Sequence, residues 1–301
     1  ALPSCSRGVA SPAPNASPSS AVAASPSASP EPTRSAPPHF ADTFDIGGGR
    51  QLFMECTGQG SPTVVFESGD TDDGRAWTNV VPGLVGLTRV CTYDRAGTGR
   101  SDAASGCRKL EDIRGDFEAL LGAAKVEPPY VLVGTSGGGY LVAGYALAHP
   151  ADVQGLVIVD TFPAIDLKKY PELTFEIGCD NPSNQEHRDY AAVEHAAWDN
   201  RTNIGDIPIT VITNDYTGYA ENDDEKDSIK GQQGWFVLNP DGSKQVIVKS
   251  GHNVPGNEPG VIVEYQYKEV IPGGSASNMR MKFQHDIPIQ IHTGWSPTGR
   301  S

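Results

Sequence analysis

One stretch decides the fold of this chain: Val131-Leu132-Val133-Gly134-Thr135-Ser136-Gly137-Gly138-Gly139. Its first residues form an apolar run typical of a buried strand, and a helical pattern begins near Tyr140. Between them lies Gly-x-Ser-x-Gly, in which the glycines two positions either side of the serine allow the strand and helix backbones to approach closely. In this strand–turn–helix context the motif exposes the serine hydroxyl above a sheet. Ser136 is therefore the candidate nucleophile, and a plain glycine-rich turn is the alternative.

Outside this turn, short apolar runs alternate with amphipathic helical patterns. We expect strands at 62–67, 89–94, 130–133, 155–160, 209–213 and 245–249, and helices at 109–124, 140–148 and 260–270. This alternation predicts an α/β fold, with a mostly parallel central sheet that helices cover on both faces. Two earlier runs, 41–46 and 51–56, flank three glycines and predict a β-hairpin.

The composition divides the chain into three parts. Residues 1–38 are mostly serine, alanine and proline with almost no large apolar side chains, so we predict a disordered linker. Residues 39–271 are long enough for one domain, within which 161–206 interrupts the alternation and is predicted to form a small lid with a helix near 186–198. For the C-terminal extension, 272–301, an edge strand and a disordered tail are both open.

The charge balance narrows the range of partners. A net charge of −14 argues against nucleic acid and against electrostatic attraction to an anionic membrane. The acidic run at 221–225 lacks the spaced ligands of a calcium loop, and the cysteines lack C-x-x-C spacing, so we expect no metal. No stretch reaches the length of a membrane span.

The cysteines favour an exported protein. Leu2-Pro3-Ser4-Cys5 is similar to the end of a bacterial lipoprotein signal, so a lipidated Cys5 could tether the domain to a membrane, and a stray free thiol is the alternative. We expect a secreted or cell-envelope-anchored bacterial protein. Four cysteines remain, and an even number predicts two disulfides with three possible connectivities, or buried free thiols. They are Cys56, Cys91, Cys107 and Cys179.

Four stretches, by their order and spacing, resemble the α/β-hydrolase family over about residues 40–271. They are Phe66-Glu67-Ser68-Gly69, the run Tyr93–Asp102, the turn Gly134–Gly138, and Ser250-Gly251-His252. The resemblance implies the α/β-hydrolase fold and a secreted or lipoprotein-type serine hydrolase, esterase- or lipase-like, that needs no cofactor. The family's topology also implies that the strands of Cys56 and Cys91 are neighbours, which favours a Cys56–Cys91 disulfide and leaves Cys107–Cys179 to tie the lid to the core.

The resemblance also implies the partners of Ser136. In this family the chain order is Ser…Asp/Glu…His, and His252 follows the last strand, where the imidazole is expected. The acid that orients the imidazole has two candidates: Asp160, at the end of strand 155–160, and Asp215, after strand 209–213. We prefer Asp160, and the alternative acid Asp215 stays open.

The family pattern assigns the oxyanion hole to two backbone N–H groups, those of Gly137 and Asp70. A carboxylate at Asp70 is tolerable only if its side chain points away from the negative intermediate. Asp94 and Arg95 are expected to brace the glycine-containing turn that follows them.

These residues predict a serine hydrolase that cleaves small-molecule carboxylic esters through an acyl-enzyme on Ser136, with His252 as general base. Two alternatives stay open: a prolyl-type aminopeptidase of the same fold, which would need lid carboxylates for a substrate ammonium group, and a catalytically silent surface-tethered binding protein. The residues do not indicate an acyl-chain length or an oligomeric state.

Overall fold

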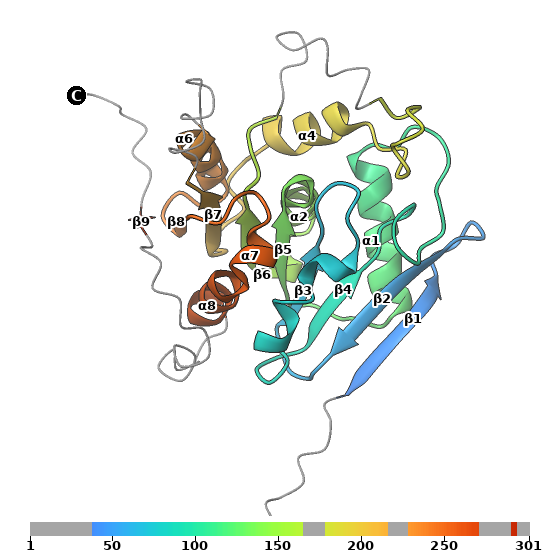
Figure 1. Ribbon diagram of the computed structural model, residues 1–301, viewed down its shortest axis with the longest axis horizontal. Helices are drawn as coiled ribbons and strands as arrows, with labels where there is room; N and C mark the ends of the chain where they lie inside the picture. The colour runs from blue at the N-terminus through green and yellow to red at the C-terminus, as the bar shows by residue number, and fades with distance from the viewer. Residues whose placement is uncertain (1–37, 165–177, 216–227, 271–289, 294–301) are drawn as a thin grey trace, which may run out of the picture. The chain divides into compact units, whose positions relative to one another are not determined.

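A computed structural model describes residues 38–164, 178–215, 228–270 and 290–293 (Figure 1). Nearly all of the predicted linker, the acidic run at 221–225 and most of the C-terminal extension lie outside the described residues. Everything described below belongs to the unit Pro37–Ser301.

The described strands form a single nine-stranded sheet in the order β1-β2-β4-β3-β5-β6-β7-β8-β9. Neighbours from β4 through β3, β5, β6 and β7 to β8 pair in parallel, whereas β1 with β2, β2 with β4 and β8 with β9 pair antiparallel. The prediction of a mostly parallel sheet is confirmed. The strands are β1 (His39–Asp45), β2 (Gln51–Thr57), β3 (Thr63–Glu67), β4 (Val90–Tyr93), β5 (Tyr130–Thr135), β6 (Val153–Val159), β7 (Ile209–Asn214), β8 (Ser243–Val248) and β9 (Gln290–Thr293).

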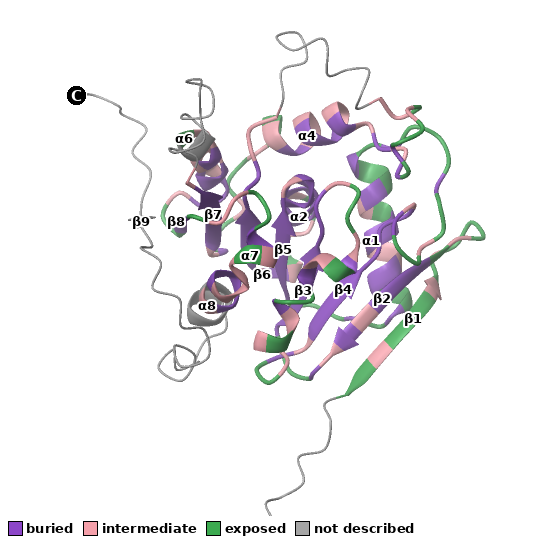
Figure 2. Cartoon of the chain, in the orientation of Figure 1, coloured by how far each residue is buried: buried purple, intermediate pink, exposed green. Residues whose placement is uncertain are grey.

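Helices pack on both faces of the sheet, and successive residues of β5 show why. Leu132 belongs to an apolar cluster with α1, α2, α4 and η4, whereas Val131 and Val133 belong to a second cluster with η1, α7 and α8. Every residue of β5 is buried, as expected for a central parallel strand (Figure 2). The α-helices are α1 (Leu110–Ala123), α2 (Gly137–Ala148), α4 (Tyr190–Asp199), α6 (Ser228–Gln232), α7 (Val254–Asn257) and α8 (Pro259–Val270), and the 3₁₀ helices are η1 (Gly74–Trp77), η2 (Val81–Gly83), η3 (Pro150–Asp152) and η4 (Gln233–Leu238).

Two helix starts differ from the predictions. Helix α2 begins at Gly137 rather than near Tyr140, because the turn at Ser136 passes directly into the helix even though three glycines disfavour helix formation. The helix expected at 186–198 begins at Tyr190, since the Asp189 side chain accepts a hydrogen bond from the Ala192 N–H (3.0 Å) and caps it there. In the extension, β9 supplies the edge strand that was one of the two open possibilities.

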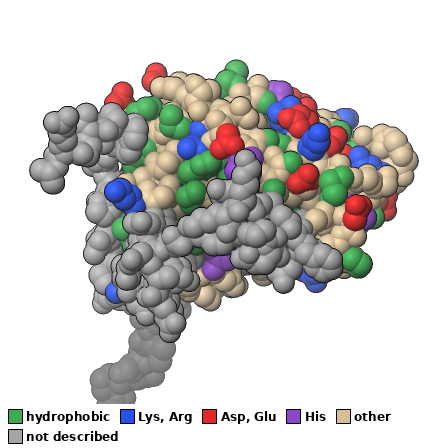
Figure 3. All heavy atoms as spheres, turned by 90° about the horizontal axis from the view of Figure 1, so that it is seen from above, with side chains coloured by type: hydrophobic (Ala, Val, Ile, Leu, Met, Phe, Trp, Pro, Cys, Tyr) green, Lys and Arg blue, Asp and Glu red, His purple; other side chains and the backbone are tan. Residues whose placement is uncertain are grey.

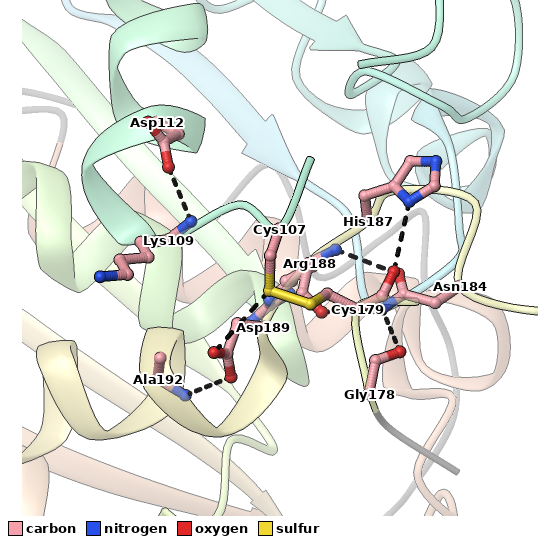
Figure 4. The surroundings of a disulfide bond; sticks show 10 residues. All are labelled: Cys107, Lys109, Asp112, Gly178, Cys179, Asn184, His187, Arg188, Asp189 and Ala192. Atoms are coloured by element: carbon pink, nitrogen blue, oxygen red, sulfur yellow. Dashed lines mark hydrogen bonds between the residues drawn. A yellow bond between two sulfur atoms is a disulfide. The ribbon is translucent and has the colours of Figure 1, made fainter. Parts of the chain in front are cut away.

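Two disulfides join segments that lie far apart in the sequence, and the predicted pairing is confirmed. Cys56 and Cys91 face each other across β2 and β4, with their Cα atoms 4.1 Å apart. Cys107, before α1, bonds to Cys179, at the start of the segment 178–189 that leads into α4 (Figure 4). The second disulfide therefore fastens part of the predicted lid to the core.

Replacing both Cys56 and Cys91 by alanine should lower the free energy of unfolding by about 3 to 4 kcal/mol, because this bond closes a loop of roughly 35 residues in the unfolded chain. Urea unfolding of the double variant, with Cys5→Ala as the control that keeps both disulfides, measures the loss. A difference below about 1 kcal/mol would contradict the expectation.

Candidate active site

The candidate nucleophile lies on a strained turn between β5 and α2. Ser136 has φ 50° and ψ −126°, a backbone conformation that non-glycine residues rarely adopt. A Cβ on Gly134 would overlap the carbonyl oxygen of Gly138, so this crossing of strand and helix needs glycine. The Thr161 hydroxyl donates to the Ser136 carbonyl oxygen (2.8 Å) and secures the turn from the end of β6. The serine side chain faces a cavity of about 260 Å³ at the edge of the sheet.

An unbroken hydrogen-bonded chain leads from this serine to a buried carboxylate. The Ser136 Oγ lies 2.9 Å from Nε2 of His252, and Nδ1 of the same ring lies 2.7 Å from Oδ2 of Asp160. The imidazole is half-exposed, whereas Asp160 is fully buried. Hydroxyl, imidazole and carboxylate therefore stand in the order that proton transfer from a serine requires.

The surroundings of Asp160 distinguish it from the other candidate acid. Its second oxygen, Oδ1, accepts from the Asn214 backbone N–H (3.1 Å) and from Nε2 of Gln232 (3.0 Å). Both carboxylate oxygens are thus oriented by donors, which offsets the cost of burying the charge. Asp215 instead lies 3.5 Å from Nζ of Lys249. The structure brings Asp160 to the imidazole.

Electrostatics at this site favour the protonated imidazole. The hydrogen bond that the imidazole donates to Asp160 raises the pKa of His252 above its ordinary value; partial burial opposes this, and the negative charges of Asp160, Asp70 and Asp72 add to it. A raised pKa makes the ring a stronger base, as proton abstraction requires.

The two residues expected to donate to an oxyanion lie near the serine. Gly137 is the first residue of α2, where N–H groups lack intrahelical acceptors, and Asp70 lines the same cavity as Ser136 and His252. The Asp70 carboxylate forms an ion pair with Arg188, which no pattern in the sequence had indicated.

Sequence reasoning also missed Asn214, the last residue of β7. Its side-chain oxygen accepts from the backbone N–H groups of Ser250 (2.9 Å) and Gly251 (2.8 Å), directly before His252. Its own N–H donates to Asp160. Asn214 therefore holds the acid and the histidine loop in one frame. A polar residue ending an apolar strand was the available signal.

Arg95 does more than brace its own turn. Its guanidinium donates to the carbonyl oxygens of Ser68 and Gly69 (both 2.7 Å), so it holds the loop that leads to Asp70. It also binds Glu186 from the 178–189 segment, through Nε to Oε2 at 2.7 Å. Burial would raise the pKa of Glu186, but the charge and hydrogen bonds of Arg95, the charge of Arg188 and the Thr71 N–H together outweigh burial and lower it. The Asp94 carboxylate, in turn, accepts from the Arg100 N–H (2.9 Å), as expected for a brace.

Charges are mixed on the face seen in Figure 3, where acidic and basic side chains alternate with apolar and neutral ones. Across the described ranges, no three His, Cys, Asp or Glu side chains gather closely enough to hold a metal ion. Among the helices of those same residues, none has both the length and the apolar character to cross a bilayer.

Comparisons with known proteins agree with this architecture. Residues 62–178 match a family model described as the alpha/beta hydrolase fold. The chain has the α/β-hydrolase fold. A solved thermophilic esterase from Thermogutta terrifontis superposes with a TM-score of 0.58 at 18% identity, covering 75% of this chain and 96% of the esterase. An epoxide hydrolase, CorEH, gives 0.58 at 14% identity, covering 78% and 99%. At these identities the similarity shows the fold.

Sequence relatives point in the same direction. The chain is 24% identical to the uncharacterized protein YqjL of Bacillus subtilis, over 73% of this chain and 88% of YqjL. It is 38% identical to a Yersinia enterocolitica protein named "Putative carbamate hydrolase RutD", over 38% of this chain and 42% of that protein. The chain thus spans less than half of this relative. Family and neighbours together support a hydrolase.

Replacing Asn214 by alanine should lower kcat by about 10- to 100-fold, because the two N–H groups before His252 lose their acceptor and the ring shifts from Ser136. Steady-state kinetics with a p-nitrophenyl ester measures the effect. Asn203→Ala is the matched control, since that side chain accepts from Gly205 N–H in an exposed turn. Equal rates in the two variants would contradict a positioning role for Asn214.

Proposed function

We propose that this protein is a serine hydrolase that cleaves carboxylic esters through an acyl-enzyme on Ser136. One observation carries the proposal: the hydrogen-bonded chain from Ser136 Oγ through His252 to the buried Asp160 carboxylate. A serine hydroxyl is a poor nucleophile unless a base lies within hydrogen-bonding distance, and here the base lies 2.9 Å away.

The reaction follows from this arrangement. Ser136 Oγ attacks the ester carbonyl carbon while Nε2 of His252 takes its proton, and Asp160 stabilises the imidazolium that forms. The Gly137 and Asp70 N–H groups stabilise the negative oxygen of the tetrahedral intermediate. His252 then protonates the leaving alcohol. Water, deprotonated by His252, releases the acid and restores the serine.

The aminopeptidase alternative needs a free carboxylate on the lid. Glu186, one of the lid acids within the described residues, is nearly fully buried and paired with Arg95, which leaves it unsuited to a substrate ammonium group. A carbamate, named for the Yersinia relative, presents the same kind of carbonyl carbon as an ester and could be attacked in the same way. The ester remains the proposed substrate, and the binding-protein alternative requires that Ser136 be unreactive.

A location outside the cytoplasm fits the cysteine chemistry. Disulfides persist mainly in oxidising compartments, and this domain carries two. We place the protein in the secreted or envelope-anchored class, with a lipidated Cys5 as the proposed tether.

A fluorophosphonate probe should label the wild-type protein at Ser136, and Ser136→Ala should abolish labelling and reduce ester hydrolysis by about 10⁴-fold or more, because no other group replaces the nucleophile. Intact mass and peptide mapping locate the label. Turnover of p-nitrophenyl esters, beside a p-nitrophenyl carbamate and aminoacyl-nitroanilides, identifies the substrate class. Turnover of the anilides alone would refute the ester proposal, and failure to label would favour a binding protein.

Asp160→Asn should lower kcat by about 10³- to 10⁴-fold, because the imidazole loses the partner that holds its tautomer and stabilises its charge. Asp215→Asn is the matched control and should stay within about threefold of the wild type, since Asp215 pairs with Lys249. A large loss in Asp215→Asn with little loss in Asp160→Asn would reverse the assignment of the acid.

The same variants test the pH dependence. His252 must be neutral to accept a proton, and its raised pKa means that kcat/KM falls, as pH decreases, at a value above the usual 6.5 or so. Asp160→Asn removes the largest cause of the raised pKa, so its acidic limb should move to lower pH. A wild-type profile that stays flat down to pH 4 would contradict a histidine base.

A further inference from the structure

A fully buried arginine lies beside the proposed oxyanion hole. The Arg188 guanidinium forms an ion pair with the Asp70 carboxylate, donates from Nη2 to the Gly137 carbonyl oxygen (3.3 Å) and lies 5.0 Å from the centre of the Tyr190 ring. Its Nε has no hydrogen-bond partner within the described residues. Burying an arginine with one donor unsatisfied costs free energy, so the presence of Arg188 at this position points to a use for its charge.

The Asp70 carboxylate lies directly against the first residue of α2. A Cβ on Gly137 would overlap that carboxylate, so the carboxylate packs directly against the Gly137 backbone. The Gly137 N–H is one of the two donors proposed for the negative oxygen of the intermediate. An uncompensated carboxylate at this position would repel that oxygen and oppose the reaction.

Arg188 is held in place independently of Asp70. Its backbone N–H donates to Oδ1 of Asn184 (3.2 Å), and its carbonyl oxygen accepts from Nδ2 of the same side chain (2.7 Å) (Figure 4). On either side, Arg108 N–H donates to the His187 carbonyl oxygen (2.8 Å) and Asp189 N–H to the Arg108 carbonyl oxygen (2.9 Å). The Cys107–Cys179 disulfide fastens the same segment. These hydrogen bonds and the disulfide therefore hold the Arg188 backbone in position, so that its guanidinium lies beside Asp70.

We propose that Arg188 is a positioning residue for catalysis: it neutralises Asp70, so that Asp70 can line the oxyanion hole without repelling the oxyanion. This inference rests on the proposed function. It adds a residue from the lid segment, 52 positions after the nucleophile, to the machinery of the reaction. It also explains how a carboxylate is accommodated where the reaction builds negative charge.

The rate of fluorophosphonate labelling tests the proposal without a known substrate. In that reaction the Ser136 Oγ–P bond forms, the P–F bond breaks, His252 takes the serine proton, fluoride leaves, and the phosphoryl oxygen occupies the oxyanion hole. Arg188→Gln keeps a donor and much of the volume but loses the charge, so labelling should slow by about 100-fold. Arg188→Lys keeps the charge and should stay within about tenfold of the wild type.

The second substitution separates charge from structure. Asp70→Asn in the Arg188→Gln background removes the uncompensated carboxylate and should restore labelling at least about tenfold relative to Arg188→Gln, and Asp70→Asn alone completes the double-mutant cycle. In Arg188→Gln the unmasked Asp70 should also raise the pKa of His252, so the acidic limb of the labelling rate moves to higher pH and returns in the double variant. Arg114→Gln, which loses an ion pair with Glu118 on α1, is the control.

Three results would overturn the proposal: wild-type labelling rates in Arg188→Gln, no recovery in the double variant, or loss of folded protein in Arg188→Gln by thermal unfolding, which would assign Arg188 to stability alone. The same labelling experiment distinguishes failure of the proposed function from failure of the inference about Arg188. A wild-type protein that reacts with no probe refutes the nucleophile and this inference together, whereas a labelled wild type with an equally reactive Arg188→Gln refutes this inference only.

Discussion

The close crossing of β5 and α2 at Ser136 is the constraint on which the site depends. Ser136 adopts a positive φ that costs energy. A side chain at Gly134, two residues earlier, would overlap the backbone of Gly138. The buried strands β3 and β6, which pair with β5 on either side, and the Thr161 hydroxyl hold this conformation in place. Parallel strands bring their carboxyl ends to one edge of the sheet, so the groups that follow β3, β6 and β8 meet around the same serine.

A second layer of the site consists of buried charges. Arg95 joins the loop after β3 to Glu186, and Arg188 joins the same loop to the helix start at Gly137. Buried ion pairs contribute little net stability, because desolvation offsets much of the attraction. Their geometric effect is clearer: two charged side chains from the segment 178–189 fix a loop more than 100 positions earlier in the chain.

The disulfide Cys107–Cys179 and the backbone hydrogen bonds of Arg108 support this second layer. They fasten the segment that carries Glu186 and Arg188, although most of the apolar core lies elsewhere, between the sheet and its helices. The Cys107–Cys179 bond therefore serves the site as well as the stability of the fold. The segment 178–189 therefore supports, through Arg188, the loop of Asp70 that lines the cavity at Ser136.

Local patterns in the sequence determined much of this protein. The β5–turn–α2 motif singled out Ser136 and alternating strands and helices predicted the parallel sheet, because each of these signals lies within a short window. The chain order of the family that the sequence resembles singled out His252. The choice between Asp160 and Asp215 required the tertiary structure, since both follow strands of one parallel sheet and the contact of Asp160 with the imidazole is not visible in the sequence. The pairing of Arg188 with Asp70 joins residues 118 positions apart, and no local periodicity encodes such a contact.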